Sequence, residues 1–322
     1  MTIIWQMAGS VVFLLILLSG LTFLNTSIWS IEFLSNCRHL ILAAGFLLSV
    51  LFLLGRRWLF LIMGIICIVL NAPPMMPLFS TPAIMNSDKA AVQSEVPTPR
   101  KKLYKMVIFN TYMFNYSATE LANFLEAVHP DFVCLSEVVT PTFQTLQKNK
   151  AIASKYPYNA FDYNTQSLLL SKYPINSIKK IEGTAQYLRS VMLQTQVTLG
   201  NKPLAIWLTH PPHPTSPLNY QKKLDFLNFF KSERLPEHLI VAGDFNMSPW
   251  SNQFQNFLDI TQLQCASFGF GFQPTWPSSQ KIIPLFPIDH AFYQGDVEVN
   301  SWKVVDQSFG SDHLPVVMDF LF

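Results

Sequence analysis

The stretch Leu239-Ile-Val-Ala-Gly-Asp-Phe-Asn-Met-Ser-Pro-Trp-Ser251 decides the fold of this chain. Its first four residues are apolar and predict a buried strand, and Gly243 permits a sharp turn directly after that strand. Asp244 and Asn246 follow the turn. An Asx-turn accounts for one of these two polar residues, but not for both together with the Met-Ser-Pro-Trp-Ser that follows. The stretch therefore predicts a strand that delivers a carboxylate and an amide to the edge of a sheet.

Similar short polar motifs follow one another across the C-terminal two-thirds of the chain. They are IFN ending at Asn110, LSE ending at Glu137, LTH ending at His210, IDH at 288–290 and SDH at 311–313. Asn, Glu, Asp and His, with no evident activated Ser or Cys, suit a hard cation that prefers oxygen ligands, combined with an acid/base pair. The pattern predicts a hydrolase site at the rim of a sheet.

The sequence resembles a known superfamily through VAGDFNMSPWS at 241–251, PTWP at 274–277, PIDHAF at 287–292 and GSDHLPVV at 310–317. This is the endonuclease/exonuclease/phosphatase superfamily of DNase I-like phosphoesterases, and within it the bacterial members anchored by N-terminal membrane helices. The resemblance covers roughly residues 104–322. It implies a four-layer α/β sandwich, with two sheets face to face and helices outside, whereas periodicity alone predicts only a mixed α/β domain.

The resemblance also implies a metal site. Glu137 follows an apolar strand and is the first candidate ligand for Mg²⁺ or Mn²⁺. Asn110 matches the family Asn beside the metal, where its amide positions the metal or the phosphate. Asp312 resembles a second ligand on the metal side. The four cysteines show no metal-binding spacing such as CxxC.

The remaining motif residues match catalytic positions of the family. Asp244 would orient or deprotonate the attacking water, Asn246 would bond the phosphate oxygens, and His210 would contact the phosphate. His313 resembles the imidazole at the scissile phosphate, and Asp289 would hydrogen-bond it and fix its tautomer. Whether Asp244 or His313 removes the water proton stays open.

Three further positions qualify this assignment. Arg189 precedes a strand where relatives often place a phosphate-binding Arg, and a surface ion pair is the alternative. Ser136 stands before Glu137 where relatives frequently carry Gln. Tyr112 stands two residues after Asn110, where the DNA-repair members carry Asp, which disfavours a repair endonuclease.

Composition indicates a membrane anchor. The 322-residue chain has a mean hydropathy of +0.25 and only 13% charged residues, which is too apolar for an ordinary soluble enzyme. The excess lies in apolar segments at 7–24, 39–54 and 58–79, which predict three membrane spans, with two as the alternative. A cleaved signal peptide is disfavoured because no charged segment precedes the first run. We expect an anchor at 1–79, a linker at 80–102 and the catalytic domain at 103–322.

The orientation of the anchor follows from Arg56 and Arg57, which form a short basic loop between the second and third segments. Such loops stay cytoplasmic, so three spans place the catalytic domain outside the bacterial cytoplasmic membrane, and two would place it inside. Residues 71–100 are rich in Pro, Ser and Ala and predict a linker. The basic residues 100–102 form either a solvated edge or a contact with anionic head groups.

The substrate is constrained by charge and by one apolar segment. A net charge of +2, with small clusters at Lys179-Lys180 and Lys222-Lys223, does not favour nucleic acid. The aromatic segment at 268–286 either packs in the core or forms an apolar rim that admits a lipid. We therefore expect a lipid-linked phosphodiester or pyrophosphate as substrate. The alternatives are a membrane-tethered nuclease and a catalytically silent scaffold. Packing rather than a disulfide is expected for Cys134 and Cys265, and the sequence does not determine the oligomeric state.

Overall fold

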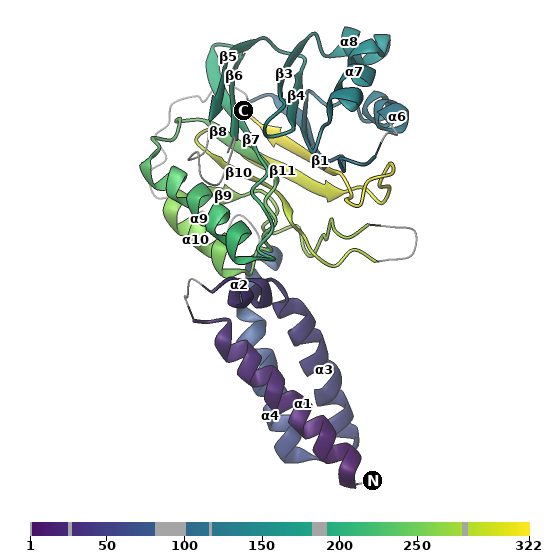
Figure 1. Cartoon of the computed structure of the whole chain (residues 1–322), viewed down its shortest axis with the longest axis vertical. Helices are drawn as coiled ribbons and strands as arrows, with labels where there is room; N and C mark the ends of the chain where they lie inside the picture. Colours follow the sequence, from purple (N-terminus) through teal and green to yellow (C-terminus); the bar gives the residue numbers. More distant parts are fainter. Residues whose placement is uncertain (1, 25–27, 81–100, 116–117, 182–191, 279–282) are drawn as a thin grey trace.

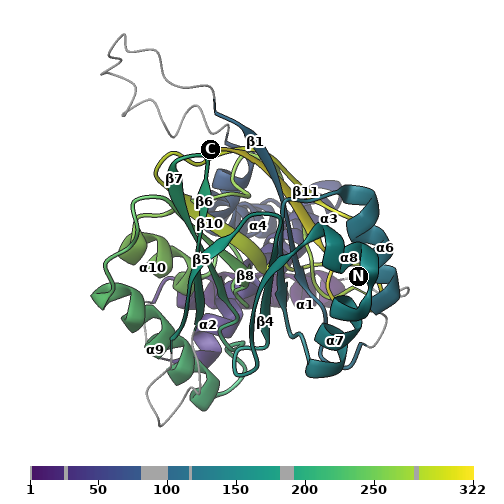
Figure 2. The ribbon, with the colours of Figure 1, turned by 90° about the horizontal axis from the view of Figure 1, so that it is seen from above.

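The computed structural model describes residues 2–24, 28–80, 101–115, 118–181, 192–278 and 283–322. Figure 1 shows a bundle of helices built from the N-terminal residues below an α/β domain built from the remainder of the chain. The two sheets of this domain face each other, and its helices lie outside them (Figure 2).

The first sheet has six strands in the order β11-β12-β1-β2-β4-β3. Its strands are β1 (Leu103–Asn110), β2 (Phe132–Ser136), β3 (Tyr158–Asp162), β4 (Ser167–Ser171), β11 (Glu298–Val304) and β12 (Val316–Leu321). β1 and β2 are parallel, whereas β12 lies antiparallel to β1.

The second sheet also has six strands, in the order β5-β6-β7-β8-β10-β9. Its strands are β5 (Ile175–Ile181), β6 (Met192–Leu199), β7 (Lys202–Thr209), β8 (Leu239–Asp244), β9 (Gln264–Cys265) and β10 (Asp289–Gln294). β7 and β8 are parallel, and β10 is antiparallel to β8. Both sheets are therefore mixed, and each contains one parallel pair at its centre.

The main core lies between the two sheets. Ile108 and Cys134 of the first sheet share one buried cluster with Ile206 and Ile240 of the second. Each fully buried aliphatic side chain of this kind contributes about 1.5–3 kcal/mol relative to an exposed one. The near-continuous apolar runs of β1, β2, β7 and β8 are explained by burial on both faces.

Helices cover the outer face of each sheet. α6 (Ala118–Val128), α7 (Thr140–Lys148) and α8 (Lys150–Lys155) pack on the first sheet, and α9 (Pro217–Ser232) and α10 (Asn252–Thr261) pack on the second.

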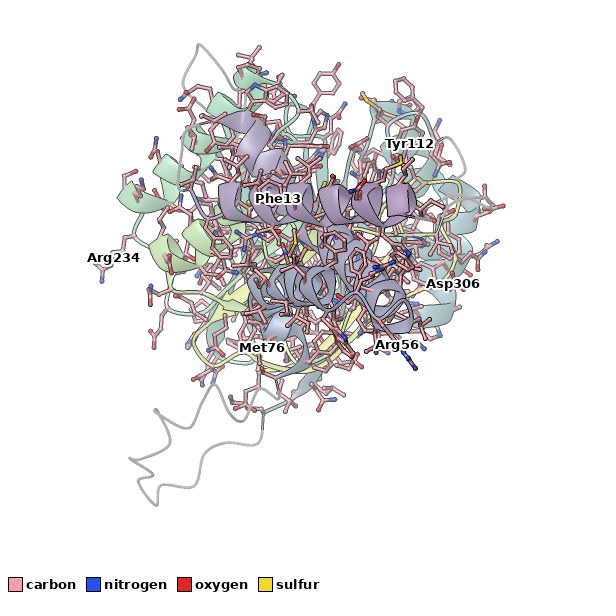
Figure 3. All side chains as sticks on the ribbon, turned by 90° about the horizontal axis from the view of Figure 1, so that it is seen from below. Phe13, Arg56, Met76, Tyr112, Arg234 and Asp306 are labelled. Carbon is pink, nitrogen blue, oxygen red and sulfur yellow. The ribbon has the colours of Figure 1, made fainter. Side chains whose placement is uncertain are left out.

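The N-terminal helical region, which the sequence predicts to be a membrane anchor and which is called the anchor below, contains α1 (Thr2–Leu21), α2 (Trp29–Asn36), α3 (Arg38–Leu54), α4 (Trp58–Asn71) and the 3-10 helix η1 (Pro73–Phe79). α1 is by itself long and apolar enough to cross a membrane. The pairs α2 with α3 and α4 with η1 reach that length only if each bent pair forms one span. α1, α3 and α4 run side by side, and the N-terminus lies at the end farthest from the sheets (Figure 1). Figure 3 views the molecule from that end, with Arg56 labelled in the turn between α3 and α4.

One expectation about the region after the anchor needs correction. The predicted linker began at residue 71, but α4 extends to Asn71, and η1 packs on the α/β domain with Leu78 buried. The backbone N–H of Gly271 donates to the Leu78 carbonyl at 2.7 Å. Residues 81–100 of the predicted linker lie outside the described residues.

The basic residues at the start of the α/β domain lie far from the anchor. Lys102 exchanges two backbone hydrogen bonds with Phe322, and the C-terminus lies at the end of the domain remote from the helical bundle (Figure 1). The Lys101 ammonium pairs with Glu298 at 2.6 Å. These two lysines therefore belong to a solvated edge rather than to a contact with head groups.

Candidate active site

Strand ends from both sheets bring the predicted polar residues together. β1 ends at Asn110, β8 ends at Asp244, and Glu137 and His210 directly follow β2 and β7. The antiparallel strand β10 begins at the same edge, where its Asp289 pairs with Asp244. The carboxyl ends of central parallel strands thus meet the amino end of their antiparallel neighbour, which explains why the motifs occur beside apolar runs.

Asn110 holds two carboxylates at the centre of the site. Its Nδ2 donates to Glu137 Oε1 and to Asp244 Oδ2, both at 3.0 Å. Its Oδ1 accepts from the backbone N–H of Tyr112 at 2.9 Å, and the backbone N–H of Met113 donates to Glu137 Oε2 at 3.0 Å. In this arrangement Asn110 positions the carboxylates through its amide nitrogen, and its oxygen points to the backbone.

Glu137, His210 and Asp244 form a group that fits a divalent cation. One ligand atom from each lies within 4.8 Å of the others. His210 Nε2 is 3.4 Å from Asp244 Oδ2 and 3.7 Å from Glu137 Oε1. Two carboxylates from separate strands and one imidazole form a donor set suited to a hard or borderline cation.

Asp312, a further predicted ligand, lines the same cavity as Glu137 and Asp244. Among the described residues, two groups of His and acidic side chains are close enough to share an ion, and Asp312 belongs to neither. Its Oδ2 accepts a hydrogen bond from Trp276 Nε1 at 3.1 Å. The contact orients the indole ring at the wall of the site.

His313 lies between two buried carboxylates. Its Nδ1 is 2.8 Å from Asp289 Oδ2, and its Nε2 is 3.6 Å from Asp244 Oδ2. Burial opposes the charged imidazolium, but the negative charges of Asp289 and Asp244 prevail and raise the pKa of His313 to about 10. The structure therefore favours a protonated imidazole here, with one N–H directed to Asp289.

Attraction between opposite charges also shifts the pKa values of Asp244 and His210. Burial alone would raise the pKa of Asp244, yet His313 and His210 hold it well below its usual range. Burial likewise opposes a charge on His210, and Asp244 and Glu137 raise the pKa of this imidazole. Asp244 is therefore a carboxylate at neutral pH, flanked by two imidazoles.

The backbone is strained at two residues of the candidate site. Glu137 and Asn246 adopt the left-handed region, with φ of 57° and 50°. Gly243 has φ of 145°, and a Cβ atom at this position would lie 2.0 Å from the carbonyl oxygen of Thr209. Glycine is thus required because β7 and β8 approach closely just before His210 and Asp244.

Asn246 is held by an interaction that the sequence did not predict. Its backbone N–H donates to Asp244 Oδ1 at 2.8 Å, and its carbonyl accepts from the ammonium of Lys223 at 2.6 Å. Lys223, which the sequence places in a small basic cluster with Lys222, is fully buried beneath the site. Burial lowers the pKa of Lys223 to about 7, and the charges of Glu32 and Asp244 oppose that effect.

Other residues singled out in the sequence lie outside this cluster or outside the described chain. The His290 Nε2 contacts the Met247 carbonyl at 2.8 Å, and burial lowers the pKa of His290 to about 4, so it is a neutral core residue. Arg189 lies outside the described residues. Cys134 and Cys265 are free, buried thiols.

The site opens into a cavity of about 1190 Å³ at the anchor end of the domain. Glu137, His210, Asp244, Asn246 and His313 form the polar part of its lining. Apolar side chains complete the wall and include Tyr112, Met113, Trp276, Phe286 and Ile288, together with Phe33 of the anchor. Figure 3 shows Tyr112 on the face that is seen from the anchor side.

The two mixed sheets with helices outside form a DNase I-like α/β fold, and a cluster of carboxylates and imidazoles lies at one shared edge. The model of the Endonuclease/Exonuclease/phosphatase family matches residues 107–313, so the chain belongs to this family. It is a metal-dependent phosphoric ester hydrolase rather than a catalytically silent scaffold, as the sequence motifs predicted. A comparison with curated protein sequences finds no match.

Solved structures share the fold at low identity. TDP2 of D. rerio, complexed with a single-strand DNA product, is 18% identical with a TM-score of 0.57, covering 68% of this chain and 99% of that chain. Beta toxin from Staphylococcus aureus with bound magnesium ions is 18% identical with a TM-score of 0.50 (67% and 99%). Sphingomyelinase C from Streptomyces griseocarneus is 17% identical with a TM-score of 0.50 (69% and 99%).

Proposed function

We propose that the protein is a membrane-anchored phosphoesterase that hydrolyses a lipid-linked phosphodiester or pyrophosphate at the surface of the bacterial cytoplasmic membrane. One observation carries this proposal. The polar cluster opens into a large, partly apolar cavity whose wall includes residues of the N-terminal helical region. A soluble substrate does not require a site that faces the anchor, whereas a lipid head group reaches such a site directly.

The apolar surface beside the cavity supports a lipid substrate. Phe272 is 39% exposed, and its ring lies 6.2 Å from that of His39 at the start of α3. Ile283 is 80% exposed in the same segment. Phe268, in contrast, is buried in the core, so only part of the aromatic segment is available for such a surface. Exposed large apolar residues next to a membrane anchor are typical of an interfacial surface.

The cofactor in this proposal is Mg²⁺ or Mn²⁺, held by the carboxylates of Glu137 and Asp244. When bound, the cation neutralises charge on the phosphate oxygens and favours attack by water. Asn110 keeps the two carboxylates in place through the hydrogen bonds described above. The magnesium ions of the beta toxin structure support this choice by analogy of fold.

The protein side chains divide the remaining tasks. Asp244 is ionised and buried, which suits it to accept a hydrogen bond from the attacking water and orient it. The Asn246 amide and the His210 imidazole face the same cavity and would bind phosphate oxygens. His313 is held as an imidazolium by Asp289 and would donate to the oxygen on which negative charge develops.

A substrate panel tests the proposed function. We expect the detergent-solubilised full chain to hydrolyse lipid phosphodiesters or prenyl pyrophosphates faster than single-stranded DNA or RNA, and to stop in excess EDTA. The measurement is kcat/KM for each substrate, with bis-p-nitrophenyl phosphate as the generic reference. If DNA or RNA were the best substrate, the protein would be a membrane-tethered nuclease instead.

Sidedness is a separate expectation. If α1, α3 and α4 each cross the membrane, the Arg56 turn is cytoplasmic and the α/β domain is outside. A reporter enzyme that is active only outside the cytoplasm should work when fused after Phe322 and fail when inserted at Arg56. The C-terminus is remote from the anchor, so the fusion does not disturb it. Reporters that fail at both positions would indicate two spans and a cytoplasmic domain.

A further inference from the structure

The bend between α2 and α3 contributes residues to the catalytic cavity. α2 ends at Asn36, α3 begins at Arg38, and the two helices meet at 56°. We call Phe33, Asn36 and Cys37 the elbow. All three line the cavity that also contains Glu137, Asp244 and His313. The anchor region therefore forms part of the cavity wall in addition to any role in membrane attachment.

The elbow is fixed to the loop that follows β8. The backbone N–H of Ser248 donates to Asn36 Oδ1 at 2.7 Å, and Trp250 Nε1 donates to the Asn36 carbonyl at 2.8 Å. One turn earlier, the Glu32 carboxylate accepts from the backbone N–H of Gln253 at the start of α10. A carboxylate at a helix N-terminus is stabilised by the unpaired N–H groups and by the helix dipole.

Ring contacts extend this attachment. The buried His39 ring lies 4.8 Å from Trp250 and 4.9 Å from Phe286, centroid to centroid. Trp250 is fully buried, and Phe286 lines the cavity. The elbow is thus packed like an internal element of the α/β domain, and its cavity-lining side chains have defined positions relative to the catalytic cluster.

The chemistry of the wall differs from that of the catalytic cluster. The charged groups Glu137, Asp244 and His313 suit the phosphate, whereas Phe33 presents an apolar ring that is 48% exposed. Trp276 and Phe286 add further apolar surface to the same cavity. Ligand sites of about 300–1,000 Å³ hold whole drug-sized molecules, so this cavity has room for an organic group beyond the phosphate.

We infer that the elbow is a substrate subsite, in which Phe33 and Cys37 contact the hydrophobic alcohol of the phosphoester while its phosphate lies at the catalytic cluster. This inference rests on the proposed function, because it assumes a substrate with an apolar organic group. It assigns to the anchor a direct part in substrate selection.

Cys37 provides a chemical probe of the elbow. It is partly accessible, whereas Cys67, Cys134 and Cys265 are buried, so a thiol reagent should modify Cys37 selectively. We expect N-ethylmaleimide to label one site in the full chain in detergent, identified by peptide mass spectrometry. Hexadecyl phosphate should slow this labelling at least about fivefold by occupying the subsite, and inorganic phosphate should not. Labelling at an unchanged rate with hexadecyl phosphate would overturn the inference.

Two matched variants complete the experiment. Phe33→Ala should raise the half-saturating concentration of hexadecyl phosphate in the labelling assay by about tenfold, since one large apolar contact is worth about 1–3 kcal/mol. Phe46→Ala removes the same ring from a 58% exposed site on α3 and should leave that concentration unchanged. Equal effects of the two variants would show that Phe33 does not contact the ligand specifically, which contradicts the inference.

The labelling assay measures binding and needs no turnover, which separates this inference from the proposed function. If hexadecyl phosphate protects Cys37 but the protein cleaves no lipid phosphoester, the subsite is supported and the proposed substrate is contradicted. If the protein cleaves lipid phosphoesters but hexadecyl phosphate does not protect Cys37, the proposed function is supported and the subsite is contradicted.

Discussion

Glu137→Gln is expected to lower kcat/KM for bis-p-nitrophenyl phosphate by about 10²–10³-fold or more. The substitution removes the ligand charge and keeps the shape of the side chain. The amide oxygen of Gln still accepts a hydrogen bond from Asn110 or Met113, so the fold should persist with an unchanged melting temperature. The measurement is a rate titration with Mg²⁺ and Mn²⁺ for both proteins, in which the variant should also require a higher metal concentration.

Glu120→Gln is the matched control for this prediction. Glu120 is exposed in the first turn of α6, outside the cavity, and its replacement should change the rate less than about twofold. Wild-type hydrolysis that persists in excess EDTA would contradict the assignment of a metal to Glu137. Near-normal activity of Glu137→Gln at saturating Mg²⁺ would contradict it as well.

His313→Ala is expected to lower the rate by about 10²–10⁴-fold, and Asp289→Asn by less. The first change removes the imidazole, whereas the second retains a hydrogen-bond acceptor 2.8 Å from Nδ1 and removes only its charge. Because the charge of Asp289 raises the pKa of His313, its removal should move the limb of the pH–rate profile that reports His313 to lower pH.

The measurement is kcat/KM between about pH 5 and 10 for both variants and for His129→Ala. His129 is exposed at the end of α6 and serves as the control, for which we expect the wild-type profile. Equal and complete losses in His313→Ala and Asp289→Asn would indicate that Asp289 does more than orient and charge the imidazole. A profile of Asp289→Asn that coincides with wild type would contradict the pairing itself.

The residues that the structure brings together in the candidate site could be predicted because each belongs to a local pattern. An apolar run followed by a polar residue predicts a buried strand with a functional group at its end, and the order of several such motifs matches one family. Gly243 was also predictable, although its close approach to Thr209 was not. The motifs did not reveal the hydrogen-bond partners of Asn110 and Asp312. Asn110 donates to Glu137 and Asp312 accepts from Trp276, and both contacts depend on the packed structure.

The sequence by itself determined the family, the mixed α/β domain, the apolar N-terminal segments and most of the polar residues that meet in the candidate site, because these features follow from short-range periodicity and motif order. Only the tertiary structure decided that Lys223 is buried beneath Asn246 and that the elbow lines the cavity. Both depend on contacts between segments far apart along the chain, such as Asn36 with Trp250. The polarity of one segment does not specify which distant surface will satisfy its hydrogen bonds. The partner is determined only in the folded chain, where both groups are buried together.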